Sequence, residues 1–262
     1  MRLLALAAVV AVALATAVAH AALAIEGGAP SEPQPYVGRL TATRDLGPGS
    51  VGERCGAVLI APAWALTAAH CLRYEAPGPY GTGEYRADDL TVGFGSLRAD
   101  GAGGHTAQVA EIFRGAQDVA LLRLAADVPV TPVRLADRPP AGGAPAVALG
   151  WGRGTGSALL EAADMQVEDV GSMLVTAPDR GAGRPGFADS GDSGGPLLLP
   201  LPGGGHVLAG IAKSAMSSAR GARSNSWVRA DRNSATYAWL GEYIDLTPAR
   251  GLPHPNIRPT SP

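Results

Sequence analysis

Three short motifs in the sequence carry the residue types that hydrolysis by a serine requires. A histidine lies in the run TAAHC from Thr67, an aspartate opens the run DVALLRL from Asp118, and a serine lies in the run GDSGGP from Gly191. A serine hydroxyl becomes a nucleophile when an imidazole takes its proton and a carboxylate fixes the tautomer of that imidazole. The candidate catalytic residues are therefore His70, Asp118 and Ser193.

The glycines around Ser193 favour a tight turn whose backbone N–H groups point to one spot. Glycine adopts backbone conformations that other residues avoid, and a pair of such N–H groups stabilises an oxyanion. We expect the amides of Gly191 and Ser193 to be these donors. Taken singly, each of the three motifs also fits an ordinary loop or strand end, but their joint occurrence favours the catalytic interpretation.

The elements that must position these residues are predicted to be strands. Short β-rich runs recur between glycine and proline breaks, in one series of about six from Tyr36 to Leu124 and a second from Ala144 to Ala230. Two such series indicate an all-β sandwich or a pair of barrels. Ser234–Asp245 is predicted to be a C-terminal helix, because its apolar residues fall on one helical face and Asn233 or Ser234 can cap it.

The order and setting of the motifs resemble the trypsin/chymotrypsin-like serine protease family. The three candidates follow the family's order of His, Asp and Ser. Cys55–Ile60 followed by Trp64 resembles the strands that lead to the histidine, and Gly150–Gly152 resembles a motif of the second barrel. The resemblance runs from Ile25 to about Leu246. It implies an all-β fold of two six-stranded antiparallel β-barrels with the active site between them, a protein or peptide substrate, and no cofactor or metal.

The first 24 residues have the pattern of an export signal. Arg2 precedes an uncharged apolar run from Leu3 to Ala19, and Ala22–Ala24 supplies the small residues that signal peptidase reads. A membrane-spanning helix is the alternative interpretation, but no basic residue follows directly to stop transfer. A cut after Ala21 is the alternative to a cut after Ala24. We expect a secreted, extracellular protein that does not bind a membrane once the signal is removed.

The composition excludes several classes of protein and of binding site. Cys55 and Cys71 are the only cysteines, which excludes a disulfide-dense scaffold and a four-thiolate zinc site, and export allows the two to pair. The formal net charge of −2 offers no basic footprint for nucleic acid. We expect a monomer. The arginine-rich composition, with Lys213 as the only lysine, is typical of a GC-rich, bacterial genome.

These observations divide the chain into four segments. We expect a signal peptide over residues 1–24, an N-terminal barrel over 25–130, a C-terminal barrel with the helix over 131–246, and a proline-rich, disordered tail over 247–262.

The first residues of the expected mature chain resemble the functional N-terminus of family members. Ile25-Glu26-Gly27-Gly28 resembles the family's Ile-Val-Gly-Gly start, with Glu26 in place of valine. In the family the freed α-ammonium pairs with the aspartate before the nucleophile, so the resemblance implies a buried pair of Ile25 and Asp192. A cut after Ala24 exposes Ile25 directly, and we therefore expect no separate zymogen cleavage.

The specificity pocket is where the chain departs from the family. Phe187 stands where trypsin-type enzymes carry an aspartate, and Asp189 stands at a usual cysteine position, so a preference for Arg or Lys is not supported. Lys213 replaces a serine. It can pair with Asp118, change the charge of the pocket or face solvent, and our sharper hypothesis is that it favours acidic or polar residues next to the cut. The expected pocket residues are Phe187, Ala188, Ser190, Lys213, Ser214 and Ala215.

The sequence therefore predicts a secreted serine endopeptidase that works through an acyl-enzyme. The alternative is a pseudoprotease, a binding module of the same fold, because the run Lys213–Ala215 alters the pocket wall. The intact set of three catalytic residue types argues against that alternative.

Overall fold

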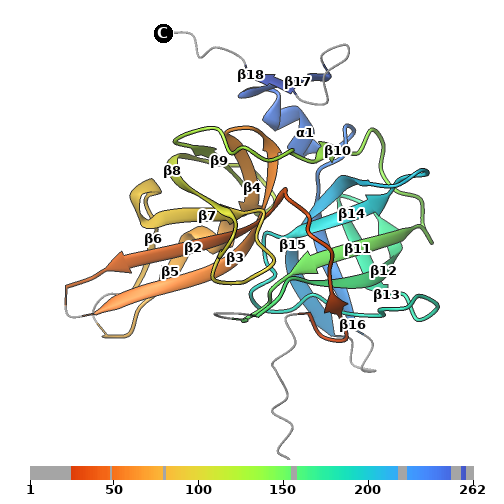
Figure 1. The fold of residues 1–262 in the computed structure, drawn as a ribbon, viewed down its shortest axis with the longest axis horizontal. Helices are drawn as coiled ribbons and strands as arrows, with labels where there is room; N and C mark the ends of the chain where they lie inside the picture. Colours follow the sequence, from red (N-terminus) through yellow and green to blue (C-terminus); the bar gives the residue numbers. More distant parts are fainter. Residues whose placement is uncertain are drawn as a thin grey trace, which may run out of the picture.

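The computed structural model describes residues 25–47, 49–78, 81–154, 158–217, 223–248 and 255–257 (Figure 1). The predicted signal peptide lies outside these residues, as does most of the predicted tail. Among the helices of the described part, none has the length and apolar character needed to cross a membrane. Strands form most of the secondary structure and helices are few and short, which confirms the predicted all-β class.

The first barrel closes through six antiparallel strands, because β2 pairs with both β3 and β7. Alternate residues of β7 point inward, and the Phe94 ring fills the interior. Gly38 on β2 makes room for that ring, since a Cβ on Gly38 would lie 2.4 Å from it. The strands are β2 (Val37–Asp45), β3 (Ser50–Ala61), β4 (Trp64–Ala68), β7 (Leu90–Phe94), β8 (His105–Arg114) and β9 (Val119–Leu124).

The second barrel also has six antiparallel strands, and it closes because β12 pairs with both β11 and β13. Trp227 fills its interior, and the indole N–H donates to Thr176 Oγ1 at 2.8 Å, so the buried polar atom is satisfied. The two barrels confirm the predicted fold. The strands are β11 (Pro145–Gly150), β12 (Glu161–Val170), β13 (Met173–Pro178), β14 (Pro196–Pro200), β15 (His206–Ser217) and β16 (Arg223–Arg229).

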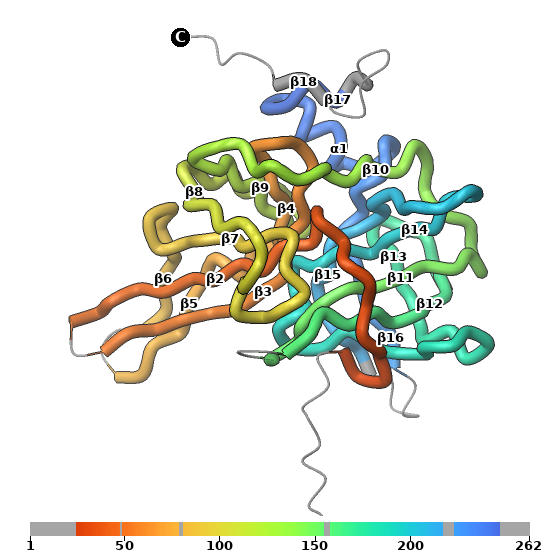
Figure 2. Tube along the Cα trace, in the orientation of Figure 1, coloured from red at the N-terminus to blue at the C-terminus, as the bar shows by residue number. Residues whose placement is uncertain are grey.

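Shorter elements connect and cover the barrels. Figure 2 shows the N-terminal segment, in red, crossing from the second barrel, where β1 pairs with β12, to the first barrel, where β2 begins. The shorter elements are β1 (Ala29–Pro30), η1 (Ala69–Leu72), β5 (Arg73–Glu75), β6 (Thr82–Glu84), η3 (Ala87–Asp89), β10 (Arg134–Leu135), α1 (Ala235–Leu240), β17 (Ile244–Pro248) and β18 (Pro255–Ile257).

The predicted C-terminal helix is present but shorter than its sequence pattern suggested. Ser234 caps it by accepting a hydrogen bond from Tyr237 N at 3.1 Å. The helix ends at Leu240, because Gly241 follows and the chain then turns into β17, which pairs with β18 within the predicted tail. Ile244, which we assigned to the helical face, is a buried strand residue instead.

An aromatic cluster packs the segment that follows the second barrel against the first barrel. Tyr243 lies after α1, and its ring centroid is 4.5 Å from that of Phe113 on β8 and 5.7 Å from that of Trp239. The Phe113 ring in turn lies 5.9 Å from Trp64 on β4. Aromatic pairs at these separations stabilise contacts beyond the area that they bury.

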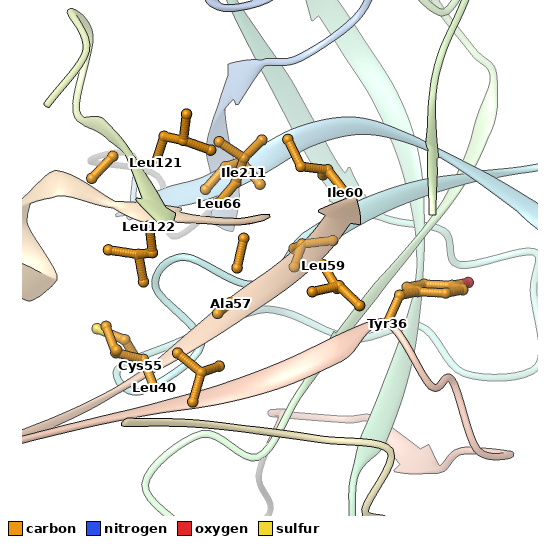
Figure 3. Packing of buried hydrophobic residues seen from close by; sticks show 14 of the residues in the cluster. Tyr36, Leu40, Cys55, Ala57, Leu59, Ile60, Leu66, Leu121, Leu122 and Ile211 are labelled. Atoms are coloured by element: carbon orange, nitrogen blue, oxygen red, sulfur yellow. The ribbon is translucent and has the colours of Figure 1, made fainter. Parts of the chain in front are cut away.

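One hydrophobic cluster extends across both barrels. A single cluster of buried side chains includes Leu66 and Leu121 of the first barrel and Ile211 of β15 in the second. Figure 3 shows these three side chains next to one another. The barrels are therefore packed together and not merely linked, which holds a site at their junction in place.

The predicted disulfide between Cys55 and Cys71 is confirmed. The two residues are 16 positions apart, and both are buried. Cys55 lies on β3 and Cys71 lies in η1, directly after His70. The bond therefore ties the short helix that carries the histidine to the wall of the first barrel.

Removing this disulfide should destabilise the protein. A C55A/C71A variant should lose about 3 kcal/mol of unfolding free energy, because a cross-link over a loop of this length restricts the unfolded chain by about that amount. Urea denaturation of the oxidised protein and of the variant measures the difference. Reduced wild-type protein is the control and should approach the variant, whereas equal stability of all three samples would contradict the prediction.

Candidate active site

Strand pairing brings His70 and Asp118 to one end of the first barrel. His70 follows β4 and Asp118 precedes β9, and these neighbouring strands pair Ala68 with Val119. Asp118 Oδ2 lies 2.7 Å from His70 Nδ1, and Asp118 Oδ1 accepts a hydrogen bond from the His70 backbone N–H at 2.8 Å. The carboxylate thus binds one ring nitrogen, an arrangement that leaves the other, Nε2, available to take up a proton.

The backbone at Asp118 has a conformation that its residue types do not predict. Gln117 and Asp118 have φ angles of 60° and 75°, a region that residues other than glycine enter rarely. The Asp118 carbonyl accepts a hydrogen bond from Ala69 N at 3.0 Å, so the short helix η1 that follows β4 holds the tight turn. Such conformations persist where surrounding contacts over-determine them, and they concentrate at functional sites.

The serine loop needs its glycines for reasons of space as well as conformation. Gly191 has a φ angle of 93°, and a Cβ on it would lie 2.0 Å from the Gly152 carbonyl oxygen. Gly194 has a φ angle of 81°, and a Cβ there would lie 2.4 Å from the carbonyl oxygen of Gly56. The Ser193 carbonyl accepts a hydrogen bond from Gly56 N at 2.7 Å, which binds the loop to β3 of the first barrel.

One cavity brings the candidate residues of both barrels together. It has a volume of about 530 Å³ and is lined by His70 and Cys55 from the first barrel and by Ser193, Gly191 and Gly152 from the second. The imidazole, the serine and the first expected oxyanion donor therefore face one space, although they are far apart in the sequence.

A smaller cavity of about 110 Å³ is also lined by Ser193, and it coincides with most of the predicted specificity pocket. Lys213 is half-buried there, and in the described part of the chain no ion pair joins it to Asp118. Asp189, which we placed at a cysteine position, also lines this cavity. The predicted residues that line it are Ala188, Ser190, Lys213, Ser214 and Ala215.

Phe187 is the predicted pocket residue that the structure does not bring to this cavity. Its ring lies 4.0 Å from the Arg223 guanidinium, and its backbone exchanges hydrogen bonds of 2.8 and 3.1 Å with Glu26. The ring is buried and contacts Arg223, and it does not line the cavity.

Asn225 is a pocket residue that sequence reasoning missed. It is buried, donates from Nδ2 to the Ala188 carbonyl at 2.7 Å, and accepts from Ala188 N at 3.1 Å, so it holds the pocket floor. Asn225 lies within the predicted second series of strands, but the residue pattern did not mark it as a pocket residue. Only the pairing of Ala215 with Asn225 across β15 and β16 places this amide in the pocket.

Asp192 is almost fully buried beneath the serine loop. Its carboxylate accepts hydrogen bonds from Gly152 N at 2.7 Å and from Asp189 N at 3.0 Å. Gly150 makes room for it, since a Cβ there would lie 2.0 Å from Asp192 Oδ1. Burial raises the pKa of Asp192 to about 7, while the two backbone donors and the positive charge of Arg39 act in the opposite direction.

The pair of Ile25 and Asp192 implied by the resemblance is not formed in this structure. Ile25 N donates its hydrogen bond to Glu161 Oε2 at 2.9 Å. The Asp192 oxygens are occupied by the backbone donors of Gly152 and Asp189 instead. Ile25 is here an internal residue, so its nitrogen is an uncharged amide and brings no positive charge to Asp192.

Comparison with known proteins gives a consistent result. A family model described as Trypsin matches residues 25–231. Transmembrane protease serine 9 of Rattus norvegicus is 32% identical over 219 residues, which are 73% of this chain and 19% of that protein. Chymotrypsin-like elastase family member 3A of Homo sapiens is 29% identical over 187 residues, or 62% of this chain and 68% of that protein. Proproteinase E of Bos taurus is 32% identical over 191 residues, which are 62% of this chain and 73% of that protein.

Because the pKa of Asp192 is raised, we expect the unfolding free energy to change with pH in a predictable direction. Between its unperturbed pKa of 3.8 and about 7, the native state holds a proton that the unfolded state releases. The unfolding free energy of the uncleaved chain should therefore fall as pH rises from about 4 to about 7, by more than about 1 kcal/mol. Urea denaturation of an S193A chain measures this fall. In an S193A/D192N chain the unfolding free energy should not show the part of this fall that comes from Asp192. An equal dependence of the unfolding free energy on pH in the two chains would contradict the raised pKa of Asp192.

Proposed function

The chain belongs to the trypsin family of serine endopeptidases, and from this membership we propose that Ser193, His70 and Asp118 are its catalytic triad. The observation that carries the proposal is the distance of 2.7 Å between Asp118 Oδ2 and His70 Nδ1. A carboxylate bound at Nδ1 leaves Nε2 of the same ring to take the serine proton. The cavity of about 530 Å³ that His70 shares with Ser193 supports the same assignment.

The proposed reaction has two halves. Ser193 Oγ attacks the scissile carbonyl carbon while His70 Nε2 takes its proton, and the amides of Gly191 and Ser193 stabilise the oxyanion. His70 then gives the proton to the leaving amine, which departs as the acyl-enzyme forms. Water attacks the acyl carbon with His70 again as base. The bond from that carbon to Ser193 Oγ then breaks, His70 returns the proton to Oγ, and the acid product leaves, while Asp118 stabilises the imidazolium in both halves.

We extend the proposal to the location of the protein. Residues 1–24 direct export and are removed, and the mature chain acts outside the cell on proteins or peptides. Two features support this: the leader has a basic residue, an apolar run and a small-residue cleavage pattern, and Cys55 and Cys71 form a disulfide of the kind that persists in oxidising compartments.

Covalent labelling tests the triad. A fluorophosphonate should label the processed protein stoichiometrically at Ser193, and S193A should not be labelled. D118N should be labelled about 10⁴-fold more slowly, because an asparagine at this position favours the wrong tautomer of His70. Mass spectrometry of the intact protein follows the reaction, and circular dichroism confirms that each variant is folded. Folded, processed protein that resists labelling would support the binding-module alternative.

Cleavage profiles test the role of Lys213. If its ammonium favours acidic or polar residues next to the cut, K213A should lower kcat/KM for such peptides about fivefold relative to apolar ones, the size expected of a half-exposed charge contact. K213R is the matched control and should keep the preference. A peptide library profile that is purely apolar, and unchanged in K213A, would show that Lys213 faces solvent without selecting substrate.

A further inference from the structure

Ser193 lines two cavities, and His70 tells them apart. His70 lines the larger cavity of about 530 Å³ but not the smaller one of about 110 Å³. In the proposed reaction His70 gives its proton to the leaving amine, so the leaving half of the substrate lies beside the larger cavity. The smaller cavity therefore receives the side chain of the residue whose carbonyl Ser193 attacks.

The side chains around the smaller cavity are mostly short, yet the cavity itself is small. A cavity that holds a benzene ring has a volume of about 150 Å³, and this one has only about 110 Å³. Alanine and serine side chains alone would leave more room than this between the strands. The largest uncharged side chain in the lining is that of Asn225. The short lining residues are Ala188, Ser190, Ser193, Ala212, Ser214, Ala215 and Ser226.

Asn225 reaches into the cavity from the inner face of β16. Residues two apart on a strand point to the same face, and Trp227, which fills the barrel interior, is two positions after Asn225. Asn225 is 3% exposed. It accepts a hydrogen bond from Ala188 N at 3.1 Å and donates from Nδ2 to the Ala188 carbonyl at 2.7 Å. The amide therefore spans the distance from β16 to the segment that precedes the serine loop.

The two hydrogen bonds fix the amide in this position. If the amide turned aside to admit a larger substrate side chain, the N–H and C=O of Ala188 would lose their partner inside the protein. Unpaired backbone groups in a buried place are unfavourable, so the amide keeps the cavity closed when substrate binds. Ala215, which pairs with Asn225 across β15 and β16, adds its methyl group to the same lining.

We propose that Asn225 is a specificity-determining residue, which limits the residue before the cut to one with a small side chain, such as alanine, serine or valine. The inference rests on the proposed function and names the class of substrate that the site accepts. It concerns the size of the side chain, whereas the hypothesis on Lys213 concerns its charge.

Peptide p-nitroanilides that differ only in the residue before the cut test this proposal. The series carries alanine, valine, leucine or phenylalanine there, so charge is constant and only size varies. The processed protein should cleave the alanine substrate with a kcat/KM at least about 100-fold higher than that of the phenylalanine substrate. N225G should open the cavity and reduce this ratio at least about tenfold, because the larger side chain then finds space.

Two further variants separate the size of the cavity from a general structural effect. N233G makes the same exchange at an exposed position that does not line the cavity, and it should leave the ratio unchanged. N225A keeps a Cβ and should shift the ratio in the same direction as N225G. A loss of structure would lower kcat/KM for all four substrates together and would not change their ratio. Circular dichroism and fluorophosphonate labelling confirm that each variant is folded and reactive.

A preference of the unaltered protein for the phenylalanine substrate would overturn the proposal. An unchanged ratio in folded, reactive N225G and N225A would overturn it as well.

Binding gives a second measurement that needs no catalysis. Calorimetry of processed S193A should show that the alanine peptide binds at least about tenfold more tightly than the phenylalanine peptide, and N225G should reduce this difference. Equal or reversed affinities in S193A would count against Asn225. Failure of fluorophosphonate labelling of the unaltered protein would instead count against the triad, and the order of affinities would still decide the role of Asn225.

Discussion

The backbone of Gly56 lies directly against the backbone of Gly194 and Gly195, and the arrangement of the site depends on this contact. A Cβ on Gly56 would lie 2.5 Å from Gly195, and one on Gly194 would lie 2.4 Å from the Gly56 carbonyl oxygen. The hydrogen bond from Gly56 N to the Ser193 carbonyl adds direction to the contact. Since the histidine and aspartate belong to the first barrel and the serine to the second, an added side chain where these glycines meet would separate the candidate catalytic groups.

Buried charge is the second constraint on the molecule. Asp192 is 2% exposed beneath the serine loop, and a carboxylate there is tolerable only with donors and a compensating charge. Two backbone N–H groups of the second barrel supply the donors, and the positive charge of Arg39 also lowers the pKa of Asp192, but burial outweighs these effects and raises that pKa to about 7. Arg39 of the first barrel also donates a hydrogen bond to the Gly154 carbonyl, so it links the two barrels. Electrostatics and packing therefore hold the serine loop from both sides.

Much of the fold and part of the site were predictable because they depend on local sequence. The alternation of β-rich runs with glycine and proline breaks predicted two series of strands, and two cysteines in a chain that we expected to be exported predicted one disulfide. The glycine pattern around Ser193 predicted the tight turn. The C-terminal helix was predicted too long, because the helical spacing of Ile244 is also compatible with the strand that it forms with β18. The strained backbone at Gln117 and Asp118 has no counterpart in the residue types.

By itself the sequence indicated which residue types could carry the chemistry, where glycine is needed and that the chain is all-β, since these depend on residue type and short-range spacing. The residue pattern left a sandwich or a pair of barrels open, and the resemblance implied the two barrels. Only the tertiary structure decided which partners the buried groups have. The Phe187 ring lies under Arg223, Asn225 holds the pocket floor, and the nitrogen of Ile25 contacts Glu161. These contacts join residues as far as 136 positions apart, and they follow from the register of β12 and β16. A shift of one residue turns every side chain of a strand to its other face, so no local pattern could reveal them.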